Sequence, residues 1–209
     1  MDVFPPRDAA LVRVALALPD GDDPDLGARL GAAREAGAEA AWLDELVLMT
    51  VLFVGFPRAL VAARLLRRLQ PVSAGEDGGR YDAWREWEMR GEATCRAVYG
   101  DHYAKLRPHV AELHPALDRW VIVDGYGRTL GRPGLDLPRR ELCAAAMLIP
   151  QRVPRQLHSH LRGALNVGAT PPQVAALLDL ADGDPLVPKQ RAATARRLWQ
   201  DILAKQPGL

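Results

Sequence analysis

The sequence predicts an all-helical protein. Apolar residues make up 48% of the 209 residues, only 6% are aromatic, and Ala and Leu dominate the apolar set. Such a composition favours helices over strands. Glycines and prolines cut the chain into segments of helical length. Several of these breaks also recur at a constant spacing of 131 residues, which indicates that a helical unit is repeated.

The first seventy residues are expected to form four helices. Pro19 ends the first helix, Asp23 caps the second, and Gly37 follows its end. The break Gly55-Phe56-Pro57 separates the third helix from the fourth. The expected ranges are 6–18, 24–35, 40–54 and 57–69.

Residues 71–80 (PVSAGEDGGR) are the clearest linker, because they are rich in glycine and lack apolar periodicity. We therefore divide the chain into a first, degenerate unit (1–70), the linker (71–80) and a second, fuller unit (81–209). In the second unit Thr170 should cap a helix, and 127–136 reads as a turn region. Helices are expected at 81–98, 102–113, 115–125, 138–148, 154–167, 171–181 and from about 188 to 204.

The glycines and prolines that end or begin helices recur at matching positions in the two units. Gly37 pairs with Gly168 and Pro57 with Pro188, each at the spacing of 131. A duplicated unit packed about a pseudo-twofold axis explains this pattern, and chance alignment of Ala/Leu-rich helix pairs is the alternative. Only the second unit holds acid–base residues at the positions that differ. Glu141 corresponds to Ala10 and His160 to Arg29.

Charge and cysteine usage exclude several classes of function. With 27 basic and 26 acidic residues, no general attraction to nucleic acid or to an acidic membrane is expected. The arginine clusters at 64–68, 139–140 and 196–197 read as solvated helix faces. Cys95 and Cys143 form no Cys-x-x-Cys motif. The N-terminus lacks the layout of a signal peptide, and the apolar run 46–56 is too short to span a bilayer, so we expect a cytoplasmic protein.

Glu141 and His160 are the main candidates for chemistry. They are separated by one short turn between two helices, and an antiparallel helix pair can bring them together. A carboxylate within reach of an imidazole fixes its tautomer and supports proton transfer. The plainer interpretation is a helix-start Glu and a satisfied interior His. Cys143 should be buried and inert, with a nucleophilic role as the minority interpretation. His158 and His160 point to different helix faces, so no metal site is expected.

Two stretches, RELCAAAML (140–148) and HSHLRGALNVGAT (158–170), resemble the core of carboxymuconolactone decarboxylase-like proteins. Further similar segments lie at 55–60, 90–94, 98–100 and 131–136. The resemblance implies the all-α fold shared with alkylhydroperoxidase D-type proteins. In those relatives a Glu, a Cys-x-x-Cys and a His form the redox site. The matching positions are Glu141, Val153, Gln156 and His160, so a thiol peroxidase is disfavoured.

The resemblance therefore implies a lyase of aromatic catabolism that needs no cofactor. Its substrate would be a small carboxylated lactone. His160 would act as general acid, polarised by Glu141, and Arg162 or Arg58 could hold a substrate carboxylate. It also implies a homo-oligomer, namely a trimer of these double-unit chains.

The second unit departs from the family pattern at 182–189 (DGDPLVPK), where the glycine-x-proline helix start belongs. The first unit keeps that segment. One hypothesis is that Phe56, Pro57 and Arg58 wall a pocket whose Glu and His come from the second unit. The alternative is that the ancestral activity is lost, leaving a non-catalytic helical oligomer.

Overall fold

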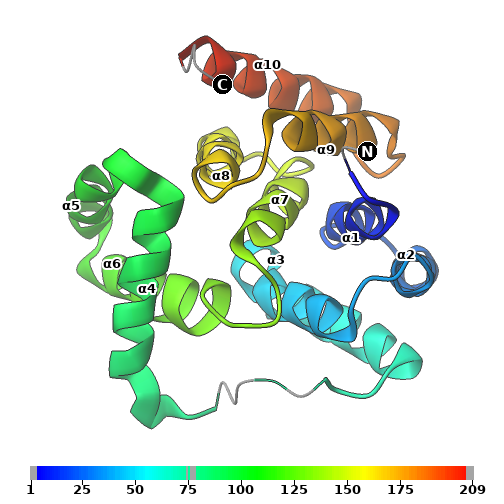
Figure 1. Cartoon of the computed structure of the whole chain (residues 1–209), viewed down its shortest axis with the longest axis horizontal. Helices are drawn as coiled ribbons and strands as arrows, with labels where there is room; N and C mark the ends of the chain where they lie inside the picture. The colour runs from blue at the N-terminus through cyan, green and yellow to red at the C-terminus, as the bar shows by residue number, and fades with distance from the viewer. Residues whose placement is uncertain (1–3, 74, 76–78, 206–209) are drawn as a thin grey trace.

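A computed structural model describes residues 4–73, 75 and 79–205 of the chain. These residues form helices and connecting loops without any strand, in agreement with the predicted fold class (Figure 1). The α-helices are α1 (Pro6–Ala17), α2 (Asp23–Glu35), α3 (Ala40–Leu69), α4 (Trp84–Tyr99), α5 (Tyr103–Leu113), α6 (Pro115–Trp120), α7 (Leu137–Leu148), α8 (Pro154–Asn166), α9 (Pro171–Gly183) and α10 (Lys189–Lys205). Short 3-10 turns η1 (Tyr81–Ala83) and η2 (Gly100–His102) flank α4, and a π-helix, η3 (Val121–Leu130), follows α6.

The helix ends follow from local sequence signals. The Thr170 hydroxyl accepts a hydrogen bond from the backbone N–H of Gln173, whose side chain in turn accepts from the backbone N–H of Thr170. Gly37 and Gly168 take the left-handed conformation that ends α2 and α8, with φ of 87° and 106°. The cap of α2 is Asp22 rather than Asp23, because the Asp22 carboxylate accepts from the Asp25 N–H.

Corresponding helices of the two units begin at the constant spacing. The pairs of first residues are Pro6 and Leu137, Asp23 and Pro154, and Ala40 and Pro171. Gly55 interrupts α3 with φ of 81°, at the place where the second unit breaks between α9 and α10. Helices α1 and α7 pack against each other, and Asp8 forms an ion pair of 2.8 Å with Arg139, its own equivalent 131 residues later. A residue that contacts its own equivalent lies near a twofold axis. The boundaries set at residues 70 and 81 stay predictions.

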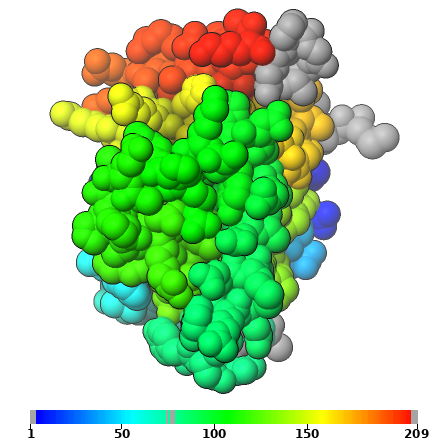
Figure 2. All heavy atoms as spheres, turned by 90° about the vertical axis from the view of Figure 1, so that its left-hand side faces the viewer, coloured from blue at the N-terminus to red at the C-terminus, as the bar shows by residue number. Residues whose placement is uncertain are grey.

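Between the linker and α7, helix α4 packs closely along η3, and together with α5 and α6 they cover one side of the molecule (Figure 2). A Cβ on Gly91 would lie 2.0 Å from the Ile122 carbonyl oxygen, and one on Gly127 would lie 2.0 Å from the Trp87 carbonyl oxygen. Both glycines are therefore needed for the close approach of the two backbones. The expected turn at 127–136 was wrong in its first part, because the helix continues as η3 to Leu130.

A buried ion cluster joins the two units. Glu45 on α3 accepts hydrogen bonds from Arg132 (3.1 Å) and from Arg140 on α7 (2.9 Å), and all three side chains are buried. Burial lowers the pKa of Arg140, and the hydrogen bond and charge of Glu45 oppose that shift. The expectation of a solvated face at 139–140 was wrong, because Arg140 is fully buried and Arg139 binds Asp8 and Asp136. Charge spacing alone does not distinguish a solvated arginine from a paired one.

Helix α3 is the one helix in the described part of the chain that is long and apolar enough to cross a membrane by length and composition. Core helices of soluble proteins pass the same test. The Gly55 break divides α3 into two parts that are each shorter than the ~20 residues a bilayer requires. Helix α3 also packs on α2, α7 and η3 and carries the buried Glu45.

Replacing Glu45 by Gln should destabilise the fold, because it leaves the buried Arg140 charge without a counter-charge. We expect the free energy of unfolding to fall by about 3 kcal/mol or more. Urea denaturation followed by circular dichroism would measure it, with Glu35→Gln, an exposed carboxylate on α2, as the control. Equal stability of the two variants would contradict this role for Glu45.

Candidate active site

The structure brings Glu141 and His160 together. Glu141 lies on α7 and His160 on α8, and the Glu141 Oε2 is 2.8 Å from the His160 Nδ1. Glu141 is 1% exposed and His160 is 8% exposed, so the pair is shielded from bulk water. Because Nδ1 is directed at the carboxylate, Nε2 on the opposite side of the ring remains available for a substrate.

Gly163 provides the space for this carboxylate. A Cβ at position 163 would lie 2.7 Å from the Glu141 Oε2 and 2.7 Å from the Val98 Cγ1. The glycine stands one turn after His160 on α8, so only a residue without a side chain lets α8 approach Glu141 so closely. Sequence alone does not indicate this role, because Gly163 lies in an uninterrupted helix and has no turn signal.

His160 lines an open cavity of about 690 Å³ whose walls are mostly apolar. The His160 ring also meets the Phe53 ring edge-on, with centroids 5.2 Å apart. The wall residues come from α3, α4, α6, η3 and the segment from α7 to α8, and they are Val51, Leu52, Phe53, Tyr99, Leu117, Trp120, Val121, Asp124, Gly125, Tyr126, Leu130, Leu148, Gln151, Val153 and Gln156. The first unit thus supplies part of the wall through α3.

Two tyrosines that hydrogen-bond to each other line this cavity. The rings of Tyr99 and Tyr126 meet edge-on with centroids 6.1 Å apart. Burial raises the pKa of both phenols, so both hydroxyls keep their protons at neutral pH. Tyr99 lies in the family-like segment 98–100, but sequence alone indicates no role for it or for Tyr126, since both lie more than thirty residues before His160, on α4 and η3. The π-helical geometry of η3, a form found often at functional sites, is a signal visible only in the structure.

The four residues expected to bind substrate lie outside this cavity wall. Phe56 is 65% exposed, and neither Phe56 nor Pro57 lines the cavity, although Val51 to Phe53 just before them do. The Arg58 guanidinium donates to the backbone carbonyls of Leu18 and Gly21 (both 2.7 Å), beyond the end of α1. Arg162 lines a second cleft described below. The structure therefore does not bring these residues together with His160, and their binding roles stay predictions.

The positions that match the redox cysteines of the relatives do line the cavity. Val153 and Gln156 both contribute to its wall, and no thiol is found among the described residues that form it. Cys95 and Cys143 are buried, and burial raises the pKa of each thiol to about 12. Both thiols therefore stay protonated and unreactive at neutral pH.

The pseudo-equivalent place in the first unit is closed by an ion pair. Arg29 corresponds to His160, and Asp184 corresponds to Phe53. Where His160 meets Phe53, the Arg29 Nη2 instead donates to the Asp184 Oδ1 at 3.1 Å, and the Asp184 side chain is 1% exposed. The departure at 182–189 thus supplies a counter-charge for Arg29. Within the ranges that the structure describes, no group of three or more His, Cys, Asp or Glu side chains could hold a metal ion.

Comparison with known proteins agrees with the resemblance seen in the sequence. The model of the carboxymuconolactone decarboxylase family matches residues 115–196, which include Glu141 and His160. Peroxisomal protein 2 of Schizosaccharomyces pombe is 29% identical over 141 residues, covering 66% of this chain and 66% of that protein, just under two thirds of its length. That relative is named as peroxisomal, and the cytoplasmic location expected for this chain stays a prediction.

Replacing Gly163 by Ala should displace Glu141 and weaken the fold. The added methyl group overlaps the Glu141 carboxylate, so we expect a loss of about 1–3 kcal/mol in urea denaturation. The His160 ring resonances in NMR spectra should shift as its partner moves. Gly31→Ala is the matched control, because a Cβ there meets nothing within 4 Å and should stabilise α2 by up to about 1 kcal/mol. A Gly163→Ala protein with native stability would contradict the tight fit.

Proposed function

We propose, from the premise that residues 115–196 are a domain of the carboxymuconolactone decarboxylase family, that this chain is a lyase that decarboxylates a small carboxylated lactone without a cofactor. The observation that carries the proposal is the buried Glu141–His160 pair at the edge of a largely apolar cavity. An isolated structural histidine would not need both a buried carboxylate partner and a face open to a cavity of this size.

The proposed reaction begins with cleavage of the bond between the carboxylate carbon and the lactone ring. Carbon dioxide leaves, and the bonding electron pair passes into a dienolate whose charge rests on oxygen. Tyr99 and Tyr126 line the cavity, and in this scheme a phenol hydroxyl of the hydrogen-bonded Tyr99–Tyr126 pair turns to donate to that oxygen. The protonated Nε2 of His160 then transfers its proton to the ring carbon, and solvent restores the proton.

In this scheme Glu141 acts by bonding to the Nδ1 of His160 and so fixing the orientation of the imidazole ring. The departing carboxylate is best placed against the apolar wall, since a cation there would stabilise the ground state rather than the transition state. Val51, Leu52 and Leu148 supply such a wall. The two arginines suggested by the sequence are not required for this arrangement.

A thiol peroxidase is the less favoured function, because Val153 and Gln156 stand at the positions of the redox cysteines. A non-catalytic helical oligomer is the remaining alternative. The retained pair and the open cavity favour the enzyme, whereas at the corresponding place in the first unit Arg29 is paired with Asp184.

We also propose that the chain assembles with copies of itself, as a trimer. Large apolar side chains are exposed along α3 at four-residue intervals, and Leu117 and Trp120 are exposed beside the cavity. The exposed fractions on α3 are 45% for Leu48, 40% for Leu52, 65% for Phe56 and 66% for Leu60. Exposed apolar surface of this kind is typical of interfaces.

Purified wild-type protein should release carbon dioxide from carboxymuconolactone. His160→Ala removes the proton donor and should lower kcat by about 10²- to 10⁴-fold, and Glu141→Gln should lower it less. Arg155→Ala is the control, because this exposed residue on α8 lines neither cavity. Release by wild type and by His160→Ala at equal rates would reject the role of His160. No release by any of the proteins would favour the non-catalytic alternative.

Light scattering should give a solution mass three times the chain mass of 22.9 kDa. Leu60→Glu places a charge in the proposed interface and should lower the mass toward that of one chain. Met89→Glu, at an exposed apolar residue of α4, should leave it unchanged. A monomeric wild-type protein would rule out the assembly.

A further inference from the structure

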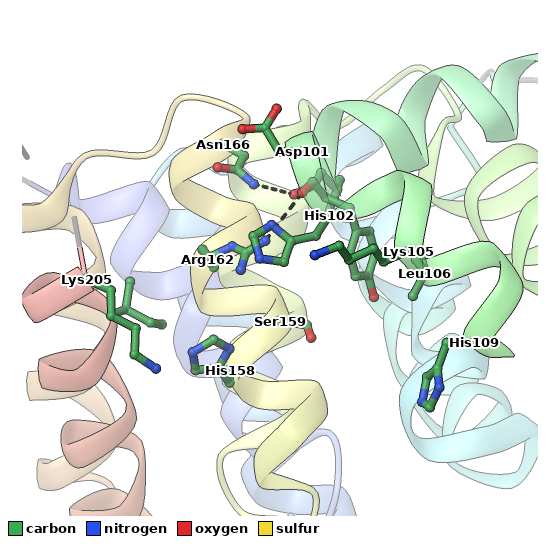
Figure 3. A pocket seen from close by; sticks show the side chains of 13 residues that line it. Asp101, His102, Lys105, Leu106, His109, His158, Ser159, Arg162, Asn166 and Lys205 are labelled. Atoms are coloured by element: carbon green, nitrogen blue, oxygen red, sulfur yellow. Dashed lines mark hydrogen bonds between the residues drawn. The ribbon is translucent and has the colours of Figure 1, made fainter.

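A second cleft, of about 840 Å³, lies along α8 between α10 and the segment that contains η2 and α5 (Figure 3). It is separate from the cavity of His160, although Tyr99 lines both. Its most conspicuous feature is a set of basic side chains drawn from four elements, η2, α5, α8 and α10. They are His102, Lys105, His109, His158, Arg162 and Lys205.

These basic groups have almost no acidic partners. Among the described residues, no ion pair joins a carboxylate to His102, Lys105, His158, Arg162 or Lys205, and His109 approaches Glu112 only at 4.0 Å with both side chains exposed. Several buried or half-buried arginines elsewhere in the described residues do have carboxylate partners. Arg29 binds Asp184, Arg107 binds Asp118, Arg139 binds Asp8 and Arg140 binds Glu45. Among the described residues the cleft therefore holds three cations without an ion-pair partner, Lys105, Arg162 and Lys205, against one lining carboxylate, Asp101.

Arg162 stands at the centre of this charge. The pKa of His102 is lowered by burial, then by the charges of Arg162 and Lys105, against Asp101. The pKa of His158 is lowered by burial, then by Arg162, Lys205 and His102, against Asp201. Arg162 points from α8 toward His102, and His158 points toward Lys205 on α10 (Figure 3). The lowered pKa values leave both imidazoles mainly neutral at neutral pH, so the cations of the cleft are Lys105, Arg162 and Lys205, and a bound anion would offset their mutual repulsion.

The cleft also fixes its central donor and offers apolar contacts. The Arg162 Nη2 donates to the Tyr99 carbonyl at 3.4 Å, and the neighbouring Asn166 Nδ2 donates to the Val98 carbonyl at 2.8 Å. These two bonds tie α8 to the end of α4. Leu106 and Ile202 line opposite sides of the same cleft, so a ligand with a charged group and an apolar part fits its surface.

We propose that this cleft binds a small molecule that carries a phosphate or pyrophosphate group, with the guanidinium of Arg162 holding the phosphoryl oxygens. A single carboxylate would balance one cation, whereas a multiply charged phosphoryl group matches several cations around one point. A nucleic acid is less suited, because the basic side chains are confined to one cleft and the whole chain carries a net charge of only +1. The proposal does not depend on the decarboxylase reaction.

Isothermal titration calorimetry of the full chain with inorganic pyrophosphate, at fixed ionic strength, tests this site. The variants are Arg162→Gln and Lys205→Gln. The control is Arg68→Gln, which removes an equal charge from an exposed position on α3. Lys205 is exposed and makes no hydrogen bond in the described structure, so its variant keeps the test valid if Arg162→Gln unfolds. Circular dichroism melting verifies the fold of each protein.

We expect wild type and Arg68→Gln to bind pyrophosphate equally and Arg162→Gln to bind it about tenfold or more weakly. Lys205→Gln should bind it several-fold more weakly. Absence of binding to wild type at millimolar pyrophosphate would overturn the proposal. So would equal affinity of the folded cleft variants and the Arg68→Gln control. Binding of a single-stranded oligonucleotide without binding of pyrophosphate would replace it by a nucleic-acid surface.

Discussion

The architecture around the candidate site depends on the buried charge of Arg140. This residue precedes Glu141 on α7, and its guanidinium binds Glu45 of α3 together with the carbonyl oxygens of Arg132 and Leu135. These bonds fix the first unit, the loop before α7 and the start of α7 relative to one another. Since Glu141 is the next residue, the same cluster sets where its carboxylate meets His160. A charge so deeply buried tolerates few alternative arrangements, because each must supply an equivalent counter-charge.

Much of the fold could be predicted from local signals, and much of the site could not. Pro, Gly and Thr mark helix ends through backbone chemistry, so Thr170 and Gly168 were read correctly from sequence. Glu141 and His160 lie on consecutive helices, which made their meeting foreseeable. Tyr99 and Tyr126 reach the cavity only through the tertiary packing of α4 and η3. The hydrophobic periodicity of the sequence does not predict that packing. The cavity wall likewise begins at Val51 rather than at Phe56, because the direction of α3 past the Gly55 break depends on packing.

Two places that are related by the spacing of 131 residues have opposite character. In one, His160 and Phe53 border an open cavity with a buried carboxylate behind the imidazole. In the other, Arg29 and Asp184 satisfy each other, and Ala10 stands where Glu141 would be. The Arg29–Asp184 pair is not an acid–base site but a contact between the units, since Arg29 lies on α2 and Asp184 follows α9. A fused pair of units can specialise in this way, whereas two identical chains cannot.

Tyr99 lies between the cavity of His160 and the basic cleft and lines both of them. One face of the chain at this residue borders the histidine cavity, and the other borders the basic cleft, while its backbone carbonyl accepts from Arg162. Tyr99 thus forms part of the wall of both cavities. A ligand in one cavity that displaced Tyr99 would change the volume of the other cavity. The two cavities are therefore adjacent, and α4 carries the residue that borders both of them.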